Sequence, residues 1–274
     1  PLLSIIIPTL DADRNGYFPV LLNQLQDQTF QQYELIIVKG DPRQGRAINT
    51  GAALARGRYL MTLDDDTHIG HRELLQELVD TLEIHPEIGM GGVANRIPAD
   101  APWLVRRVMQ EMPRRSSAMV DRITVSDMAE HPCLIMRKDI FCQVGGENEF
   151  LPRGLDPYLR QAFRQAGYKV VVIPKVFIHH LPPSTFGRLL RQFFRNGVAA
   201  AYVNRFHPEW VIELTAEHRE LEQPRVGWKA RMRRQVVQLA GALGSMRLVF
   251  FLNQCAYLTG FLWGGARFAR RAVR

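Results

Sequence analysis

Three consecutive aspartates, Asp64, Asp65 and Asp66, directly follow a short apolar run at residues 59–63. Adjacent carboxylates repel one another and raise each other's pKa unless a cation or hydrogen-bond donors compensate. A hard divalent ion such as Mg²⁺ or Mn²⁺, shared between carboxylate oxygens and a diphosphate, is the usual compensation. The alternative is a solvated acidic turn or a cap for the helix expected next. The buried run before the aspartates favours a metal site.

A histidine pair, His179 and His180, follows the apolar residues 176–178. A neutral imidazole can complete a metal site built on aspartates. Successive side chains of a strand point to opposite faces, so one histidine of the pair is expected to face the metal. The alternative is that both histidines are structural, and the pair alone does not decide between the two.

Asp156 precedes Pro157 in the segment LDPYLRQAF. Proline fits the first turn of a helix, which makes Asp156 the expected N-cap. That position would also hold a carboxylate rigidly at the mouth of a cleft, as a general base requires. The two roles are compatible.

The elements expected to position these residues alternate between strands and helices. Buried strands are predicted at residues 3–8, 34–38 and 59–63, with helices at 18–28 and 46–55 between them. This order is typical of an α/β fold with a Rossmann-like, mostly parallel central sheet flanked by helices. In such sheets ligands bind beyond the carboxyl ends of the strands, which is where the three aspartates fall.

The pattern continues beyond the aspartates after a less regular stretch. Residues 98–130 show little period and are expected to form a flexible excursion over the site. Further strands are predicted at residues 89–93, 133–137 and 170–173, and further helices at residues 73–84 and 157–165.

The net charge of +8 over 274 residues is unevenly distributed. Residues 223–274 contain ten basic residues and no acidic ones, while residues 1–222 are close to neutral. With 46 % hydrophobic and 23 % charged residues, wholesale disorder, collagen and coiled coil are excluded. We therefore expect a body at residues 1–222 and a basic tail at residues 223–274.

The tail contains an uncharged run, residues 248–266, between Arg247 and Arg267. A basic and apolar tail fits a bilayer surface better than nucleic acid. The run is about long enough to span a hydrocarbon core, yet Asn253, Gln254 and three glycines weaken it. An interfacial helix or a helical hairpin is therefore favoured at least as much as a span. The alternative is a buried helix packed on the body. We expect a helical, membrane-associating extension.

The compartment is predicted from the cysteines and the opening residues. Cys133, Cys142 and Cys255 form no spaced set, which favours a reducing environment. The opening run SIIIPTL is too short for a signal peptide and lacks a basic segment. We expect a cytoplasmic body attached peripherally or integrally to the inner membrane.

Six blocks of the sequence, in order, resemble the family 2 glycosyltransferases, which have a GT-A fold. The resemblance covers roughly residues 3–200. Six blocks in register are more specific than any single one. The blocks are SIIIPTLD, QLQDQTFQQYELIIV, GRAINTGAALARGRYLMTLDDD, CLIMRKDIFCQVGG, LDPYLRQAFRQAGYKV and VFIHH.

The resemblance implies an inverting transfer of one sugar from a nucleotide-diphosphate sugar. It assigns Asp156 as the base that deprotonates the acceptor hydroxyl, and a Mn²⁺ or Mg²⁺ ion to Asp66 with His180 or His179. His180 fits the family's late histidine slightly better. The residues implied to contact the nucleotide sugar are Pro8, Thr9, Asp41, Arg46, Asn49, Asp64, Asp65, Arg191 and Arg195.

The chain departs from the family pattern at several points, among them Tyr158, which stands where the family has a later Asp. Lys39-Gly40-Asp41 replaces the usual Asp-Asp-Gly-Ser, so Asp41 is a candidate substitute for the contact to the base. Leu155 replaces the Glu that precedes the catalytic Asp. The motif of processive synthases is absent, and Arg188, Arg191 and Arg195 recur there with helical spacing, as phosphate contacts or as a solvated basic face.

The resemblance, taken with the basic and apolar tail, implies a hexosyl- or deoxyhexosyltransferase that acts on a lipid-linked or cell-envelope glycan acceptor. Two alternatives remain. A sugar nucleotidyltransferase would need a basic, glycine-rich phosphate loop near residue 10, and the sequence there is not one. A non-catalytic nucleotide-sugar-binding or scaffold protein is favoured by Lys39 and Leu155 and disfavoured by the retained aspartates.

Overall fold

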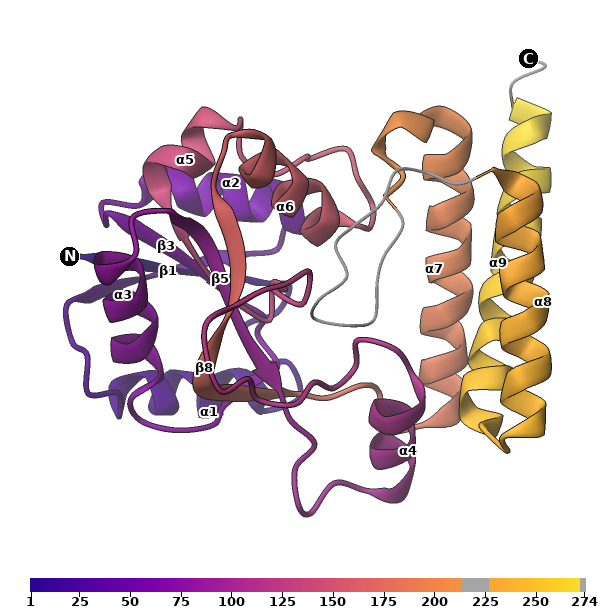
Figure 1. Cartoon of the computed structure of the whole chain (residues 1–274), viewed down its shortest axis with the longest axis horizontal. Coiled ribbons are helices and arrows are strands. Elements are labelled where there is room, and N and C mark those ends of the chain that lie inside the picture. Colours follow the sequence, from indigo (N-terminus) through magenta and orange to yellow (C-terminus); the bar gives the residue numbers. More distant parts are fainter. Residues whose placement is uncertain (213–226, 272–274) are drawn as a thin grey trace. The chain divides into compact units, whose positions relative to one another are not determined.

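The computed structural model describes residues 1–212 and 227–271 (Figure 1). It divides them into two compact units, the first made of residues 1–98 and 116–181 and the second of residues 99–115, 182–212 and 227–271. The expected boundary between residues 222 and 223 lies outside the described residues, as do Arg225 and Arg274 of the basic tail. The division into residues 1–222 and 223–274 therefore stays a prediction.

The first unit is built on an eight-stranded sheet with the order β2-β1-β3-β7-β5-β8-β4, and β6 pairs with β8 beside this path. Every sheet-forming run expected from the sequence is a strand in the structure. The strands are β1 (Leu3–Thr9), β2 (Tyr33–Lys39), β3 (Tyr59–Leu63), β4 (Thr67–Ile69), β5 (Ile88–Asn95), β6 (Thr124–Val125), β7 (Cys133–Arg137) and β8 (Lys169–His180).

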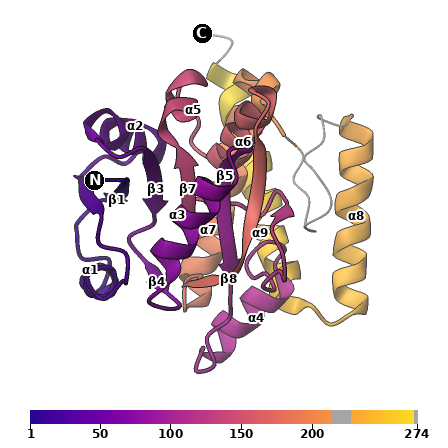
Figure 2. The same cartoon turned by 60° about the vertical axis from the view of Figure 1, so that its left-hand side comes forward.

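The sheet is mixed, which corrects the expectation of a mostly parallel one. β1 is parallel to β2 and to β3, and β5 is parallel to β8. β7 is inserted antiparallel between β3 and β5, as Figure 2 shows. The antiparallel insertion follows from the chain path, because β7 arrives after a long excursion instead of a simple strand-helix-strand crossover. β4 and β6 also pair antiparallel to β8.

Helices cover both faces of this sheet (Figure 1). α1 and α3 pack on one face, where alternate residues of β1 and β3 such as Ile5 and Met61 are buried with them. α2, α5 and α6 pack on the other face, against Ile6, Leu60 and Leu134. The helices are α1 (Tyr17–Gln26), α2 (Gln44–Leu54), α3 (Leu74–Ile84), α5 (Lys138–Gln143) and α6 (Leu155–Gln165).

A glycine lets α2 lie close against β1. A Cβ added at Gly51 would lie 2.5 Å from Cγ2 of Ile6, inside van der Waals contact. This contact fixes the helix whose first turn carries Gln44 toward the aspartates at the end of β3.

The second unit is helical. It consists of α4 (Trp103–Glu111), α7 (Phe186–Phe206), the 3₁₀ helix η1 (Pro208–Trp210), α8 (Trp228–Gly244) and α9 (Leu248–Arg271). α4 lies inside residues 98–130, so the expectation of an irregular excursion there is wrong in part. Its apolar positions Leu104 and Val108 share a core with Leu189, Val249 and Phe250.

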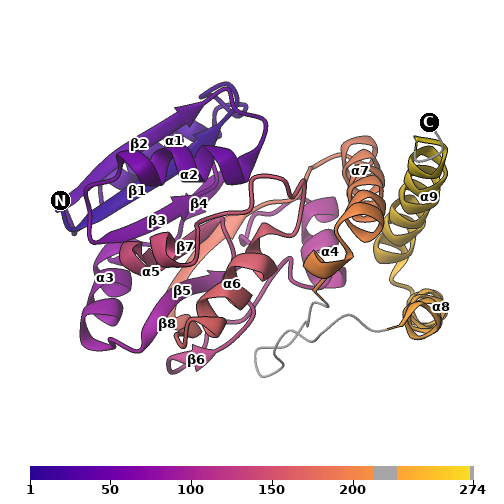
Figure 3. The same cartoon turned by 90° about the horizontal axis from the view of Figure 1, so that it is seen from above.

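The uncharged run at residues 248–266 forms most of α9, which contacts both α7 and α8 (Figure 3). The packing on α7 is close, because a Cβ added at Gly260 would lie 2.0 Å from the carbonyl oxygen of Phe194. Leu252, Leu262 and Trp263 of α9 are nevertheless exposed. Among the described residues, we find no helix with the length and hydropathy needed to cross a bilayer.

Candidate active site

The three aspartates lie at the carboxyl end of β3, and two of them meet His180. Nε2 of His180 lies 3.1 Å from Oδ1 of Asp66 and 3.7 Å from Oδ2 of Asp64. One ligand atom from each of the three residues lies within 4.8 Å of the other two. Two carboxylates and an imidazole form a donor set that suits Mn²⁺ or Mg²⁺. This arrangement agrees with the prediction of a metal site.

Strand pairing explains how His180 reaches the aspartates. β4 turns back directly after Asp66, and Thr67 is the antiparallel partner of His180. Asn95, the last residue of β5, fixes the backbone of His180 from the other side. The His180 N–H donates to Asn95 Oδ1 at 2.9 Å, and Asn95 Nδ2 donates to the His180 carbonyl at 3.2 Å.

The His179 ring lies outside the cluster of Asp64, Asp66 and His180. Neighbouring strand residues point to opposite faces. Nδ1 of His179 lies 2.6 Å from the carbonyl oxygen of Arg96, and its ring lies beside those of His68 and Phe177. The assignment of His179 as a metal ligand is therefore not supported by the geometry.

Asp65 also points away from His180. The Thr9 hydroxyl at the end of β1 donates a 2.6 Å hydrogen bond to Asp65 Oδ2, and Arg14 lies 3.3 Å from its other oxygen. Arg14 also donates to Asp66 Oδ2 at 2.8 Å. Asp65 and Thr9 therefore hold the ends of two strands together, and their predicted contacts to a donor stay predictions, as does that of Pro8 on β1.

The environments of the clustered carboxylates differ. Burial raises the pKa of Asp64 to about 6, although the nearby His180 opposes this shift. Burial would also raise the pKa of Asp66, but His180 and Arg14 outweigh it and hold that pKa well below its usual range. A bound divalent cation would favour the ionised form of both groups.

Asp41 and Arg46, both expected to contact the nucleotide, pair with each other. Arg46 Nη2 donates to Asp41 Oδ1 at 2.8 Å, and the Arg43 N–H donates to the same carboxylate at 2.9 Å. These hydrogen bonds lower the pKa of Asp41 to about 2. The pair lies in the loop and first turn between β2 and α2, beyond the carboxyl end of β2.

Asn49 makes protein contacts that the sequence does not reveal. Its Nδ2 donates to the Glu147 carbonyl at 2.9 Å and to Glu149 Oε1 at 2.9 Å. Its Oδ1 accepts from the Glu147 N–H at 2.8 Å. Asn49 thus ties α2 to the loop before α6, and its predicted donor contact stays a prediction.

Asp156 is inside α6, which corrects its expected place at the N-cap. Gly154, with φ of 81°, is the N-cap, and no side chain caps the helix. The Asp156 carboxylate instead accepts from the backbone N–H of His131 at 2.7 Å and is hydrogen-bonded to Nδ1 of the same histidine. Its side chain remains 30 % exposed, so a ligand can reach it.

Asp156 and the metal cluster belong to one site. Thr62 near the end of β3 donates to the His131 carbonyl at 3.1 Å, and Thr67 donates to the Pro132 carbonyl at 2.8 Å. The charges of His131 and Asp156 are close enough to Asp64 to alter its pKa. Arg191 and Arg195 are exposed on α7, in the other unit, and their predicted part in donor binding stays a prediction.

Several polar residues of this site escape sequence reasoning. Gln44 donates to Asp64 Oδ1 at 2.9 Å, while Asn95, Arg14, His131 and Glu147 contact residues already named. Each is a single polar residue without a repeating pattern. The one available signal was a polar residue next to a buried apolar run. His131, which lies just before β7, is such a residue.

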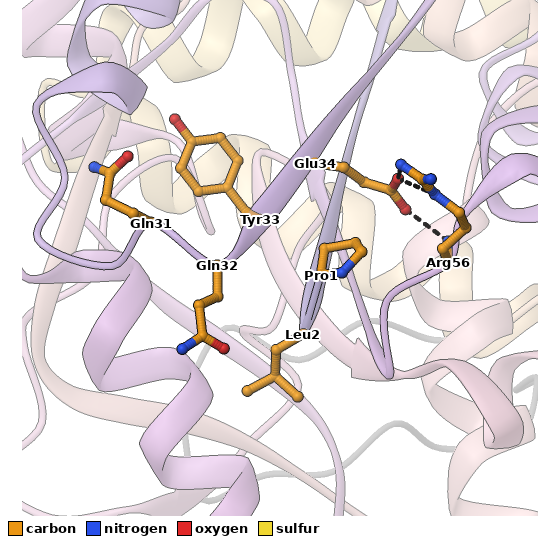
Figure 4. A pocket seen from close by; sticks show the side chains of 7 residues that line it. All are labelled: Pro1, Leu2, Gln31, Gln32, Tyr33, Glu34 and Arg56. Atoms are coloured by element: carbon orange, nitrogen blue, oxygen red, sulfur yellow. Dashed lines mark hydrogen bonds and ion pairs between the residues drawn. The ribbon is translucent and has the colours of Figure 1, made fainter.

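A separate pocket, shown in Figure 4, lies at the amino-terminal ends of β1 and β2. It surrounds the start of β1 and β2 and is lined by Pro1, Leu2, Gln31, Gln32, Tyr33, Glu34 and Arg56. Its carboxylate, Glu34, is already paired with Arg56. Because the pocket lies at the amino-terminal ends of these strands, it is away from the carboxyl ends, where the aspartates lie.

Comparison with known proteins bears on the family resemblance and on the fold. Residues 39–145 match the family model described as glycosyl transferase family 2. The chain thus carries a recognisable segment of that family, and the expected resemblance is confirmed. No curated protein matches the sequence.

Solved structures with a similar fold include glycosyltransferases. The mannosyltransferase PcManGT from Pyrobaculum calidifontis, in complex with GDP-Man and Mn²⁺, is 13 % identical, with 96 % of this chain and 87 % of that chain covered and a TM-score of 0.59. S. aureus TarS is 13 % identical, with 76 % and 43 % covered and a TM-score of 0.50, so the match spans under half of that chain. TarS 1–349 with UDP-GlcNAc is 11 % identical, with 98 % and 92 % covered and a TM-score of 0.50.

At these identities the similarity establishes the fold, which is that of the GT-A glycosyltransferases.

Proposed function

We propose that the chain is an inverting, metal-dependent glycosyltransferase that moves one sugar from a nucleotide-diphosphate sugar to an acceptor hydroxyl. The observation that carries the proposal is the cluster of Asp64, Asp66 and His180 at the strand ends of a GT-A fold, beside the partly exposed carboxylate of Asp156. PcManGT, which has this fold, was solved with GDP-Man and Mn²⁺.

In this proposal, one group of residues binds the metal ion and Asp156 accepts the proton. Asp64, Asp66 and His180 would hold a Mn²⁺ or Mg²⁺ ion, which neutralises charge on a leaving diphosphate. Asp156 accepts the proton of the acceptor hydroxyl as its oxygen bonds to the anomeric carbon. The bond between that carbon and the diphosphate oxygen breaks, and the nucleoside diphosphate leaves. Attack and departure on opposite faces invert the anomeric configuration.

We also propose that the body works on the cytoplasmic side of a membrane, on a lipid-linked or envelope glycan acceptor. The support is a surface on α8, here called the α8 face, whose members are Met232, Val236, Val237, Leu243, Lys229 and Arg233. Its four apolar side chains are each about half exposed or more. Lys229 and Arg233 are exposed and no acidic residue occurs in the helix. Apolar and basic side chains together fit an anionic bilayer surface.

Titration calorimetry of the purified chain with UDP, GDP, dTDP and CDP, with and without Mn²⁺, tests the proposal. We expect one nucleotide to bind with Mn²⁺ and to lose that binding in Asp66→Ala. The control is Asp80→Ala, since Asp80 is exposed on α3. Absence of binding for all four nucleotides would contradict the proposal and favour a scaffold protein.

A further inference from the structure

His131 is a buried imidazole held between two carboxylates. Its Nε2 lies 2.6 Å from Oε1 of Glu147, and its Nδ1 is hydrogen-bonded to Oδ1 of Asp156. The His131 and Glu147 residues are 2 % and 3 % exposed. Because each ring nitrogen faces a carboxylate oxygen, the doubly protonated imidazolium satisfies both contacts at once.

The charges around His131 favour that form. Burial alone would lower the pKa of His131, but the carboxylates of Asp156 and Glu147 outweigh it and raise that pKa well above the usual range. In turn His131 and Arg160 hold the pKa of Asp156 well below its usual range against the effect of burial. The charge of His131 also acts on Asp64, whose pKa it lowers.

The contacts leave one oxygen of Asp156 for a ligand. The ring and the backbone N–H of His131 both bind Oδ1. In the described residues no hydrogen bond to Oδ2 is present, and Asp156 is the one member of the three whose side chain is substantially exposed. The carboxylate is thus fixed through one oxygen while the other stays available.

Glu147 is itself held firmly. Asn49 binds both its N–H and its carbonyl, and Gly146 allows this approach, since a Cβ there would lie 2.6 Å from Asn49 Oδ1. Oε2 of Glu147 is buried without a hydrogen-bond partner in the part of the chain that the structure describes. The contact of Glu147 Oε1 with His131 is therefore the side-chain hydrogen bond that the structure describes for this carboxylate.

We propose that Glu147 and His131 form a buried relay that positions Asp156, with one carboxylate oxygen turned to the acceptor hydroxyl. His131 and Glu147 are positioning residues, because they act through Asp156. This inference rests on the proposed function, in which Asp156 is the base.

The relay is tested first by NMR of the full chain labelled with ¹⁵N-histidine, which needs no substrate. Of the eight histidines, the His131 signal is identified by its loss in His131→Asn. We expect a doubly protonated ring above pH 7, where ordinary histidines with a pKa of about 6.5 are mostly neutral. Glu147→Gln should lower the pKa of His131, and the control Glu149→Gln, which keeps an oxygen for Asn49, should not. A neutral His131 at pH 7 in the unmodified chain would overturn the relay.

Kinetics then separate the relay from the proposed function. The assay measures nucleoside diphosphate released from the nucleotide sugar whose nucleotide binds, with membrane lipid extract as acceptor. Glu147→Gln should lower kcat about 10-fold with an unchanged donor KM, and shift the acidic limb of the pH profile to higher pH, because Asp156 loses the support of a charged His131. Equal kcat and pH profiles for Glu147→Gln and Glu149→Gln would overturn the relay. Normal turnover in Asp156→Asn would instead overturn the role of Asp156 in the proposed function.

Discussion

Nε2 of His180 lies 3.1 Å from Oδ1 of Asp66, although the two residues come from the end of β8 and the loop after β3. The pairing of Thr67 with His180 produces this contact, and it places the neighbouring His179 opposite His68 instead. The two adjacent histidines therefore provide a matched pair of variants.

His180→Asn should weaken Mn²⁺ binding by about 10-fold or more, since it removes one of three ligands. His179→Asn removes an identical side chain outside the cluster and should leave Mn²⁺ affinity unchanged. Electron paramagnetic resonance of free Mn²⁺ measures both affinities without nucleotide. Equal losses in the two variants would refute the assignment of His180 as the ligand.

Gly51→Ala should lower the free energy of unfolding by about 1–3 kcal/mol, because the added methyl group meets Ile6 at the contact between α2 and β1. Urea denaturation followed by circular dichroism gives this difference. Gly187→Ala, where a Cβ meets nothing within 4 Å, is the control. A Gly51→Ala protein as stable as the control would show that α2 does not lie as close to β1 as described.

Glu34 links the stability of the first unit to pH. Burial works against its charge, but hydrogen bonds from the Arg56 N–H at 2.6 Å, from Ser4 at 2.7 Å and from the Arg56 side chain lower its pKa to about 2. A carboxyl group with a lowered pKa stabilises the fold above its unfolded pKa, about 4.5, and loses this contribution as pH falls toward 2.

Glu34→Gln should therefore reduce Tm at pH 7, and the difference from the unmodified chain should shrink as pH falls from about 4.5 toward 2. Differential scanning fluorimetry across this range measures it. A difference in Tm that stays constant with pH would show that the charge of Glu34 contributes nothing to stability.

The α8 face predicts binding to anionic vesicles. Lys229→Glu with Arg233→Glu should weaken binding to vesicles of phosphatidylglycerol and phosphatidylcholine at least about 10-fold, at roughly 1 kcal/mol for each basic residue. Vesicle sedimentation of the full chain measures this. The control is the double variant Arg122→Glu with Lys175→Glu. It makes the same change of charge at two exposed positions of the first unit and should leave vesicle binding unchanged. Absence of binding of the unmodified full chain to these vesicles would refute the membrane proposal.

These surface variants are preferable to deletion of residues 223–274. Val249 and Phe250 of α9 are buried in the core of the second unit with Leu104 and Leu189. Deletion of the tail would expose that core, so a loss of membrane binding could not be assigned to the α8 face.

The order of elements and the place of the aspartates were predictable from local patterns. Apolar runs such as those of β1 and β3 are buried on both faces, and Asp64 follows β3 as expected. The antiparallel place of β7 was not predictable, because Cys133–Arg137 has the same apolar pattern in either direction.

Two features depend on contacts between distant segments: which histidine meets Asp64 and Asp66, and which residues hold Asp156. The choice between His179 and His180 follows from the pairing of β4 with β8, and three residues of β4 are too short a run to predict. His131 and Glu147 are isolated polar residues next to buried runs, whose partnership appears once α2, β7 and α6 are assembled.

The central claim is tested most directly by sugar transfer in Asp156→Asn. Transfer of labelled sugar from the donor selected by calorimetry to membrane lipid extract, in the presence of Mn²⁺, is compared between the full chain and this variant. We predict that transfer falls by about 10²–10⁴-fold, as expected for loss of a general base, while nucleotide affinity stays the same. Undiminished transfer by Asp156→Asn, or no transfer by the unmodified chain from any donor, would contradict the account.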